Sequence, residues 1–211
     1  MPTIAQARAW YSTTDPVHGF DHVMRVYRMT ERIGEALGAD LEVLRAAALL
    51  HDASGAHPND KAGRAAHEHR SADFAREVLA SEGWGQDRIQ AVLHCIRTHR
   101  YRGTEQPQTL EARVLFDADK LDVVGAFGVA RTIGYAVQAG QPVFAEPSAQ
   151  FLQHGEEEPG EPHSAYHEYL FKLRRVPERM YTQPARELAR ERIKLLTAFF
   201  EGLRAEAAGP A

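Results

Sequence analysis

The sequence predicts an all-α protein, and three observations support this fold class. Apolar residues recur mostly at three- and four-residue spacing, which is the period of a helix that buries one face. Alternating runs of Val, Ile and Thr between turn residues, the pattern of half-buried strands, are nearly absent. The composition, 44% hydrophobic and 26% charged over 211 residues, is that of an ordinary globular chain. We therefore expect helices packed around a hydrophobic core.

Helical segments are expected along most of the chain, with one long connection. Asp40 is the expected N-cap of the third helix, because it precedes the apolar run LEVLRAAALL and aspartate is favoured at that position. Four prolines and an acidic run predict an exposed loop over 140–163. The simplest organisation is a single-domain helical bundle with a core at about 15–135 and a helical C-terminal extension at about 164–205. The expected helices are 3–12, 19–37, 41–53, 65–82, 86–99, 109–121, 123–139, 164–174 and 183–205.

Charge and cysteine content limit the partners and the compartment. Lys and Arg number 25 against 29 Asp and Glu, a net charge of −4, so neither a nucleic-acid polymer nor a membrane is expected as a partner. Cys95 is the only cysteine, which excludes an intrachain disulfide. The sequence contains no signal-peptide pattern at its start and no 18-residue apolar stretch. We expect a cytoplasmic protein and leave open whether it forms a homo-oligomer.

Histidine is unusually frequent, with 11 copies, and three of these residues lie beside apolar runs. His51 and Asp52 directly follow LEVLRAAALL, where unpaired polar groups are costly to bury. Taken alone, this pair is more typical of helix-end capping or surface hydrogen bonding than of a metal site. His18 and His22 are four residues apart and share one face of a predicted helix, just ahead of an apolar stripe. Neutral imidazoles and carboxylates together are suited to divalent transition metals.

Aspartates also interrupt the apolar helical region EARVLFDADKLDVVGAFGVAR. Buried carboxylates require a cation or hydrogen-bond donors. Asp117 and Asp119 are two residues apart and diverge by about 200° around a helix, so both should not reach one metal. Facing helices of a bundle commonly supply ligands to a shared interior site. A divalent metal would satisfy these aspartates together with the histidines upstream.

The residues resemble a known family. The pattern H…HD…D, carried by His22, His51, Asp52 and an aspartate of DADKLD, is similar to that of the HD-domain metal-dependent phosphohydrolase superfamily. The phrases DPVHGFDHVMRV, LLHDA, HRSADFAREVL, VLHCIRTH and EARVLFDADKLDVVGAFGVAR are similar, in order and spacing, to a subgroup of small stand-alone bacterial HD proteins. The closing stretch HEYLFKLRRVPERMYTQPARELARERIKLLTAFF also resembles that subgroup, so the likeness covers nearly the whole chain.

The resemblance implies a divalent metal ion held by His22, His51, Asp52 and Asp119. The A-D-K-L phrase selects Asp119, and Asp117 is the fallback ligand. The ion that the resemblance implies is Mn, Ni, Fe, Co, Mg or Zn, and its identity is left open.

The resemblance further implies hydrolysis of a nucleotide or related phosphate ester, including release of pyrophosphate from nucleoside triphosphates. Asp122 is expected to support a ligand from behind, one helical turn from Asp119. Either Asp52 or Asp122 would orient the attacking water, so the general base is left open. Two other classes compete with this interpretation: a non-catalytic nucleotide-binding HD protein and a di-iron HD-fold oxygenase.

Further polar residues are candidates for the phosphate pocket. His18 would contact phosphate, support a ligand or cap a helix, and Lys120 would contact phosphate oxygens or form an ordinary salt bridge. His94 and His99 point about 140° apart around a helix, so only one is expected to face inward. For them we favour a polar wall to the pocket over a second metal. The phrase HEH at 67–69 matches the subgroup but is explained nearly as well by exposed residues near a helix start. Surface or loop positions are expected for His154, His163 and His167.

Overall fold

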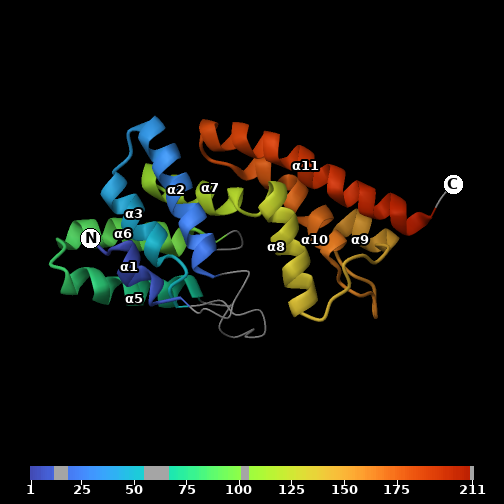
Figure 1. Cartoon of the computed structure of the whole chain (residues 1–211), viewed down its shortest axis with the longest axis horizontal. Helices are drawn as coiled ribbons and strands as arrows, with labels where there is room; N and C mark the ends of the chain where they lie inside the picture. Colours follow the sequence, from blue (N-terminus) through green and yellow to red (C-terminus); the bar gives the residue numbers. More distant parts are fainter. Residues whose placement is uncertain (12–18, 55–66, 101–104, 210–211) are drawn as a thin grey trace. The chain divides into compact units, whose positions relative to one another are not determined.

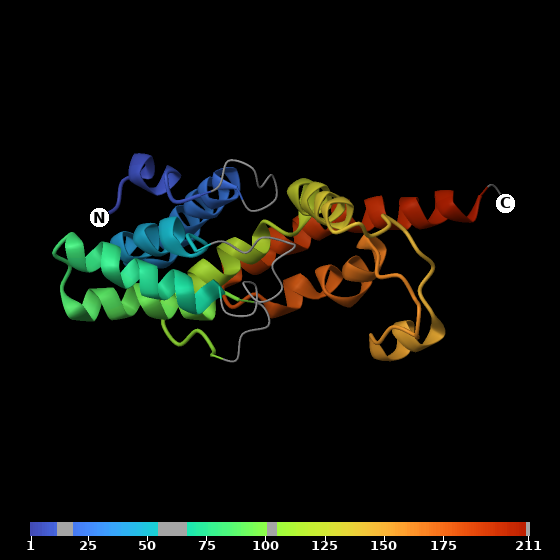
Figure 2. The same ribbon diagram turned by 90° about the horizontal axis from the view of Figure 1, so that it is seen from below.

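The computed structural model describes residues 1–11, 19–54, 67–100 and 105–209, and the regular elements in these ranges are all helical (Figures 1 and 2). The all-α fold class is thus confirmed. The chain divides into two compact units, Met1–Asp122 with Met180–Ala185, and Val123–Arg179 with Arg186–Ala211. None of the described helices has both the length and the apolar character needed to cross a lipid bilayer. The first unit contains α1 (Ile4–Arg8), α2 (Phe20–Leu37), α3 (Leu41–Leu50), α5 (His67–Ser81), α6 (Gln86–Thr98) and α7 (Leu110–Leu121).

Helix α3 lies at the centre of the first unit, with α2, α5, α6 and α7 packed against it. Most of its side chains are buried, and the alanines at 46–48 are short enough to let neighbouring helices approach closely. The Asp40 carboxylate accepts hydrogen bonds from the N–H groups of Glu42 and Val43 at 3.0 and 3.1 Å. The N-cap expected from the sequence is therefore confirmed. Because α3 is buried and ends at Leu50, the next two residues, His51 and Asp52, also lie in the interior.

A glycine, Gly34, lies where α2 packs against α3. A Cβ atom added at Gly34 would lie 2.5 Å from Cδ1 of Leu44, a distance that side chains do not adopt without a shift. Helix α2 ends at Leu37 and is followed by Gly38, whose φ of 68° is the left-handed conformation that favours glycine. The two helices are thus close-packed and joined by a short turn.

Helices α5 and α6 pack side by side, and both views show them adjacent (Figures 1 and 2). Their inner faces supply alanine, leucine, isoleucine and valine to the same core as α3 and α7. This pairing places the start of α5 next to the end of α6. The buried residues that α5, α6 and α7 contribute include Ala72, Ala75, Leu79, Ile89, Val92, Leu93, Ile96, Leu115 and Ala118.

The second unit has its own core. Tyr169 of α10 stacks on Phe200 of α11, with ring centroids 4.8 Å apart. Its elements are α8 (Gly125–Gln138), α9 (Ala149–His154), α10 (Ala165–Phe171), the 3-10 helix η1 (Leu173–Arg179) and α11 (Gln183–Ala208), whose first residues up to Ala185 belong to the first unit.

The segment 140–163 is more ordered than the sequence predicted. It contains the short helix α9, capped by Ser148 and anchored by the buried ring of Phe151. The Glu161 carboxylate accepts from the N–H groups of Ser148 and Glu158, both at 2.7 Å. The expectation of an exposed loop was therefore wrong for Ala149–His154, which form α9, and it missed the polar contacts that fold this segment back on itself.

The expected surface position of His167 was also wrong, because its side chain is fully buried. Its Nδ1 lies 2.7 Å from Oγ of Ser164 and its Nε2 lies 2.9 Å from Oε1 of Glu161. Both ring nitrogens are thus satisfied within the second unit, and the residue has a structural role there.

Candidate metal centre

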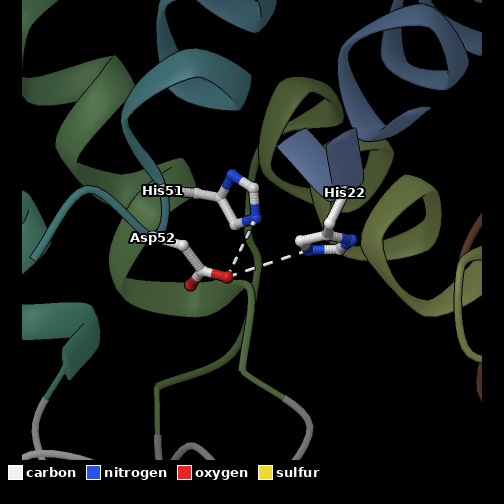
Figure 3. A group of neighbouring side chains, drawn as sticks. All are labelled: His22, His51 and Asp52. Carbon is white, nitrogen blue, oxygen red and sulfur yellow. Dashed lines mark ion pairs between the residues drawn. The ribbon is translucent and has the colours of Figure 1, made fainter. Parts of the chain in front are cut away.

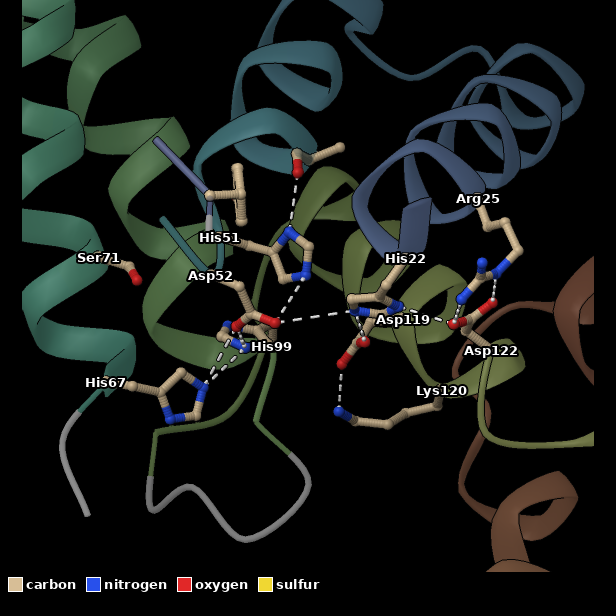
Figure 4. Close-up of polar contacts among 12 residues, drawn as sticks. His22, Arg25, His51, Asp52, His67, Ser71, His99, Asp119, Lys120 and Asp122 are labelled. Atoms are coloured by element: carbon tan, nitrogen blue, oxygen red, sulfur yellow. Dashed lines mark hydrogen bonds and ion pairs between the residues drawn. The ribbon is translucent and has the colours of Figure 1, made fainter. Parts of the chain in front are cut away.

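Four histidines and two aspartates from different helices of the first unit converge on one buried region (Figure 4). All of them lie at or next to a helix end, where the chain can direct a side chain past the end of its own helix. The residues are His22 in the first turn of α2, His51 and Asp52 directly after α3, His67 at the start of α5, His99 directly after α6, and Asp119 in the last turn of α7.

His22, His51 and Asp52 form the first group, in which one ligand atom from each residue lies within 4.8 Å of the others (Figure 3). Oδ2 of Asp52 lies 3.7 Å from Nε2 of His22 and 3.5 Å from Nε2 of His51. Oδ1 of Asp119 lies 3.3 Å from the same His22 nitrogen. The four side chains expected as metal ligands are thus close together and buried.

Asp52, His67 and His99 form a second group on the other oxygen of the same aspartate. Oδ1 of Asp52 lies 3.4 Å from Nε2 of His67 and 3.4 Å from Nε2 of His99. The two imidazole nitrogens are themselves 3.4 Å apart. Asp52 therefore belongs to both groups, with one oxygen directed to each (Figure 4).

Backbone carbonyls set the orientation of two of the imidazoles. Nδ1 of His51 donates to the carbonyl of Ala48 at 2.8 Å, and Nδ1 of His99 donates to the carbonyl of Ile96 at 2.6 Å. A neutral imidazole that carries its proton on Nδ1 has a lone pair on Nε2. The Nε2 atoms that face Asp52 are therefore acceptors, as metal ligands must be.

Asp122 sets the orientation of the His22 imidazole, as the backbone carbonyls do for His51 and His99. Its Oδ2 accepts from Nδ1 of His22 at 2.7 Å, and Arg25 donates to both of its oxygens at 2.7 and 2.9 Å. A carboxylate behind a histidine fixes the ring orientation and directs the other nitrogen forward. Because both of its oxygens are engaged, Asp122 supports His22 and does not face the centre of the cluster.

Two buried atoms of the cluster, Nε2 of His51 and Oδ1 of Asp52, have no hydrogen-bond partner among the described residues. A buried polar group left without a partner costs about 1–3 kcal/mol, and more when it is charged. A cation between the imidazoles and the carboxylates would satisfy both atoms. Imidazole nitrogens combined with carboxylate oxygens are ligands for first-row divalent metals, so the residues fit such an ion.

Burial and neighbouring charges hold these groups in their metal-binding forms. Burial lowers the pKa of His51 to about 4, so this imidazole is neutral near pH 7. Burial by itself would raise the pKa of Asp52. The positive charge of His51 and His99 when they are protonated, together with hydrogen bonds that His67 and His99 donate in their protonated forms, outweighs burial and lowers this pKa well below its usual range. Lys120 and His22 overcome burial in the same way and lower the pKa of Asp119. Metals bind deprotonated ligands, so His51, Asp52 and Asp119 need no further proton loss near neutral pH.

The structure does not bring Asp117, the fallback ligand, to the cluster. Its buried carboxylate accepts from the N–H groups of Tyr181 and Thr182 at 2.9 and 2.7 Å and from the Thr182 hydroxyl at 2.7 Å. It thereby anchors the chain just before α11. The wide angle between Asp117 and Asp119 around α7 separates an anchoring aspartate from one that faces the histidines.

The remaining candidates for the phosphate pocket occupy different places. His94 does not join the cluster, because its Nδ1 contacts Oε1 of Glu105 at 2.9 Å and its Nε2 accepts from the N–H of Gln108 at 3.0 Å. Nζ of Lys120 donates to Oδ2 of Asp119. Lys120 therefore forms the salt bridge that was one of its two expected roles. His18 lies outside the described residues.

Sequence reasoning missed His67 as a member of the cluster. Its signal was the resemblance of HEH at 67–69 to a phrase of the subgroup, and the position near a helix start pointed to an exposed residue instead. Only the pairing of α5 with α6 shows that this helix start faces Asp52.

A helical domain with a buried His-Asp pair, surrounded by histidines and aspartates from neighbouring helices, defines the class of fold and site. The family model for the HD domain matches residues 19–124, a segment that includes every residue of the cluster. The chain therefore belongs to the HD-domain family.

Individual relatives resemble the chain over nearly its whole length. The protein YpgQ of Bacillus subtilis (strain 168) is 30% identical over 97% of this chain and 93% of its own. A crystal structure of YpgQ in complex with ADP matches with a TM-score of 0.74 at 28% identity, covering 98% and 99% of the two chains. A structure from Lactobacillus plantarum matches with a TM-score of 0.75 at 26% identity, covering 98% and 95%.

The same fold occurs in a protein from an uncultured Thermotogales bacterium that is described as a predicted HD superfamily hydrolase. The two chains share 24% identity with a TM-score of 0.63, and the match covers 96% of this chain and 90% of that one.

The two aspartates of α7 are separable by experiment. Asp117→Asn should lower the free energy of unfolding by about 1–3 kcal/mol, because an amide nitrogen cannot accept from the backbone N–H groups it would face, and Mn²⁺ binding should persist. Asp119→Asn should lose Mn²⁺ instead. Equilibrium dialysis with elemental analysis measures the metal, and urea unfolding in EDTA measures stability. Loss of metal from a folded Asp117→Asn protein, with Asp119→Asn unaffected, would reverse the assignment.

The low pKa of His51 should make the metal-free protein sensitive to acid. Between pH 6.5 and about 4 the unfolded chain binds a proton at this residue and the folded chain does not. Stability should therefore fall as the pH is lowered through this window, by up to about 1.4 kcal/mol per pH unit from this residue. Urea unfolding at pH 6.5, 5.5 and 4.5 measures the slope. His51→Gln should reduce it, and equal slopes in the two proteins would contradict the assignment.

Proposed function

We propose that this HD-domain protein is a metal-dependent phosphohydrolase that acts on a nucleotide or a related phosphate ester. The observation that carries the proposal is the buried cluster around Asp52, in which the imidazoles of His22 and His51 direct Nε2 lone pairs at a carboxylate. A divalent ion held by His22, His51, Asp52 and Asp119 supplies Lewis-acid chemistry, polarising a phosphoryl oxygen and lowering the pKa of a bound water.

The residues of the chain prepare the site for that chemistry. Asp122 and Arg25 keep the proton of His22 on Nδ1, and the Ala48 carbonyl does the same for His51. Lys120 offsets the charge of Asp119 from its second oxygen. Of the two carboxylates considered for orienting the attacking water, Asp122 is occupied by His22 and Arg25. Each oxygen of Asp52 faces one group of the cluster, so the geometry assigns this role to neither carboxylate.

The second group supports a second cation position that shares Asp52. Two Nε2 atoms 3.4 Å apart, each 3.4 Å from the same carboxylate oxygen, repel one another when both carry lone pairs, and a cation between them removes the repulsion. The sequence favoured a polar wall in this region. The placement of His67 beside His99 favours a second metal instead.

A nucleotide is the substrate class with the best support. The YpgQ crystal structure contains ADP, and the two chains are similar over almost their whole lengths. Positive charge next to a phosphate is the main electrostatic requirement for phosphoryl transfer, and an ion in this cluster supplies it. Release of pyrophosphate from nucleoside triphosphates is the more specific reaction within this proposal.

A screen of nucleotides and phosphate esters tests the proposal. The protein supplied with Mn²⁺, Ni²⁺, Co²⁺ or Mg²⁺ should release phosphate or pyrophosphate from at least one of these compounds. The double variant His51→Ala/Asp52→Ala should be at least about 100-fold slower, because charge stabilisation and activation of water are both lost. His94→Ala is the matched control, since this histidine lies outside the cluster, and it should retain activity.

Equal rates for the wild type and the double variant would refute the proposed site. If thermal stability rises with ADP while no tested metal gives turnover, the protein is instead a nucleotide-binding module.

The number of ions is a separate prediction. In excess Mn²⁺ the wild-type protein should bind two ions per chain, and His67→Ala/His99→Ala should bind one, because only the second group is removed. Elemental analysis after removal of free metal measures both, with His94→Ala as the control. One ion in the wild type would restrict the proposal to the first group.

A further inference from the structure

Two histidines of the cluster are backed by an arginine–carboxylate pair. Behind His22 lies Asp122, which is held by Arg25 through two hydrogen bonds. Behind His67 lies Glu68, which is held by Arg100. In both cases the carboxylate is on the Nδ1 side of the ring. Nε2 of both histidines is directed at Asp52, as Figure 4 shows. The second arrangement therefore has the same three types of side chain in the same order, with a longer contact between histidine and carboxylate: 3.5 Å from Nδ1 of His67 to Oε2 of Glu68, against 2.7 Å from Nδ1 of His22 to Oδ2 of Asp122.

Glu68 is an unusual residue for the first turn of a helix, because its side chain is buried. Only 5% of the residue is exposed, and a buried carboxylate is costly unless it is paired. Nη1 of Arg100 donates to Oε1 and Oε2 at 3.2 and 3.4 Å, and Nδ1 of His67 lies 3.5 Å from Oε2. The buried charge is thus shared between an arginine and a histidine of the cluster.

The position of the proton on His67 decides whether this residue can bind a cation. With the proton on Nε2, the ring donates toward Asp52 or His99 and cannot be a ligand on that side. With the proton on Nδ1, the ring faces Glu68 as a donor and presents a lone pair to Asp52. His99 already has its proton on Nδ1, because it donates to the Ile96 carbonyl. All three residues of the second group can bind a cation only when His67 also carries its proton on Nδ1.

We propose that Glu68 and Arg100 are positioning residues for the second cation position: Glu68 accepts the Nδ1 proton of His67, Arg100 holds Glu68 in place, and Nε2 of His67 thereby becomes a ligand. The proposal rests on the proposed function, because the second position acts only if the cluster binds divalent ions. The chain order supports it, since His67 and Glu68 are adjacent, as are His99 and Arg100. The start of α5 supplies the ligand His67 and the carboxylate Glu68, and the residues after α6 supply the ligand His99 and the arginine Arg100.

A purely structural role would have different consequences. The Arg100–Glu68 contact also ties the start of α5 to the residues just after α6, so its loss lowers stability in either case. Only a positioning role changes the tautomer of His67 and the affinity of the second ion. Affinity and tautomer, and not stability, are therefore the deciding measurements.

The chain contains a matched control for this experiment. Arg97, Glu105 and His94 form a third arginine–carboxylate–histidine set, with contacts of 2.9 Å on both sides of the carboxylate. The far nitrogen of His94 accepts from the backbone of Gln108 and not from any ligand of the cluster. Glu105→Gln therefore removes a carboxylate placed between an arginine and a histidine, as Glu68→Gln does, but at a position where the affinity for cations should not change.

The test is a Mn²⁺ titration of the full chain by calorimetry, with the wild type, Glu68→Gln, Arg100→Lys and Glu105→Gln. Partners behind metal ligands typically change affinity by 10- to 100-fold. Glu68→Gln should weaken the second ion by about 10-fold or more and leave the first unchanged. Arg100→Lys keeps the charge but loses the guanidinium geometry, and should weaken the second ion less. Glu105→Gln should bind both ions as the wild type does.

Imidazole nitrogen NMR of the metal-free proteins gives a readout that does not depend on metal. His67 should carry its proton on Nδ1 in the wild type and shift toward Nε2 in Glu68→Gln. In a His67→Ala background, adding Glu68→Gln should have no further effect on Mn²⁺ affinity, because the pair then has no ligand to orient.

The outcomes separate this inference from the proposed function. A wild-type protein that binds two ions and hydrolyses its substrate, with both affinities unchanged in Glu68→Gln, overturns the inference alone. The inference is also overturned if Glu68→Gln lowers the melting temperature but leaves the tautomer of His67 unchanged. Binding of a single ion by the wild type also overturns it, and binding of none overturns the metal site as well.

Discussion

The burial of Asp52 among imidazoles is the interaction on which the rest of the site depends. A carboxylate in the interior is tolerated only when cations or donors surround it. Here the neighbours that lower its pKa are His51, His67 and His99, yet Oδ1 has no hydrogen-bond partner among the described residues. The carboxylate is thus held ionised in a place where neutral side chains alone do not satisfy it. That combination is unfavourable for folding and favourable for binding a divalent ion.

The helix ends explain how the fold sustains this arrangement. The last carbonyls of a helix lack intrahelical partners, and His51 and His99 each donate Nδ1 to a carbonyl three residues earlier, at Ala48 and Ile96. One hydrogen bond therefore caps the helix and also fixes the tautomer that directs Nε2 inward. Capping and ligation were alternatives for the His51–Asp52 pair in the sequence, but in the structure they are compatible. A helix end suits such a ligand because its orientation is set by backbone and not by a mobile side chain.

Properties set within one helix could be predicted from the residues themselves. The meeting of His22, His51, Asp52 and Asp119 was expected only from the family resemblance, and other properties set between helices were missed. The helical spacing, the Asp40 cap and the divergence of Asp117 from Asp119 follow from the geometry of single helices. The position of His67 depends on how α5 packs against α6, which periodicity does not specify. The hydrogen bonds of Arg25 and Arg100 to buried carboxylates were missed for the same reason, because each spans two elements. In 140–163, a few polar contacts of Glu161 outweighed a composition typical of loops.

The distribution of charge in the cluster also favours a phosphate ligand. Two outer carboxylates, Asp122 and Glu68, are each neutralised by an arginine and contribute little net charge to the centre. The inner carboxylates are Asp52 and Asp119, and Lys120 offsets one of them, so the formal inner charge is −1 when the imidazoles are neutral. A single divalent ion reverses this sign, and a second ion makes the centre more positive. Had the arginines been absent, the outer carboxylates would have cancelled the charge of the ions and repelled a phosphate. With ions bound at the proposed site, the arginines would preserve positive charge there, in addition to their proposed part in orienting the histidines.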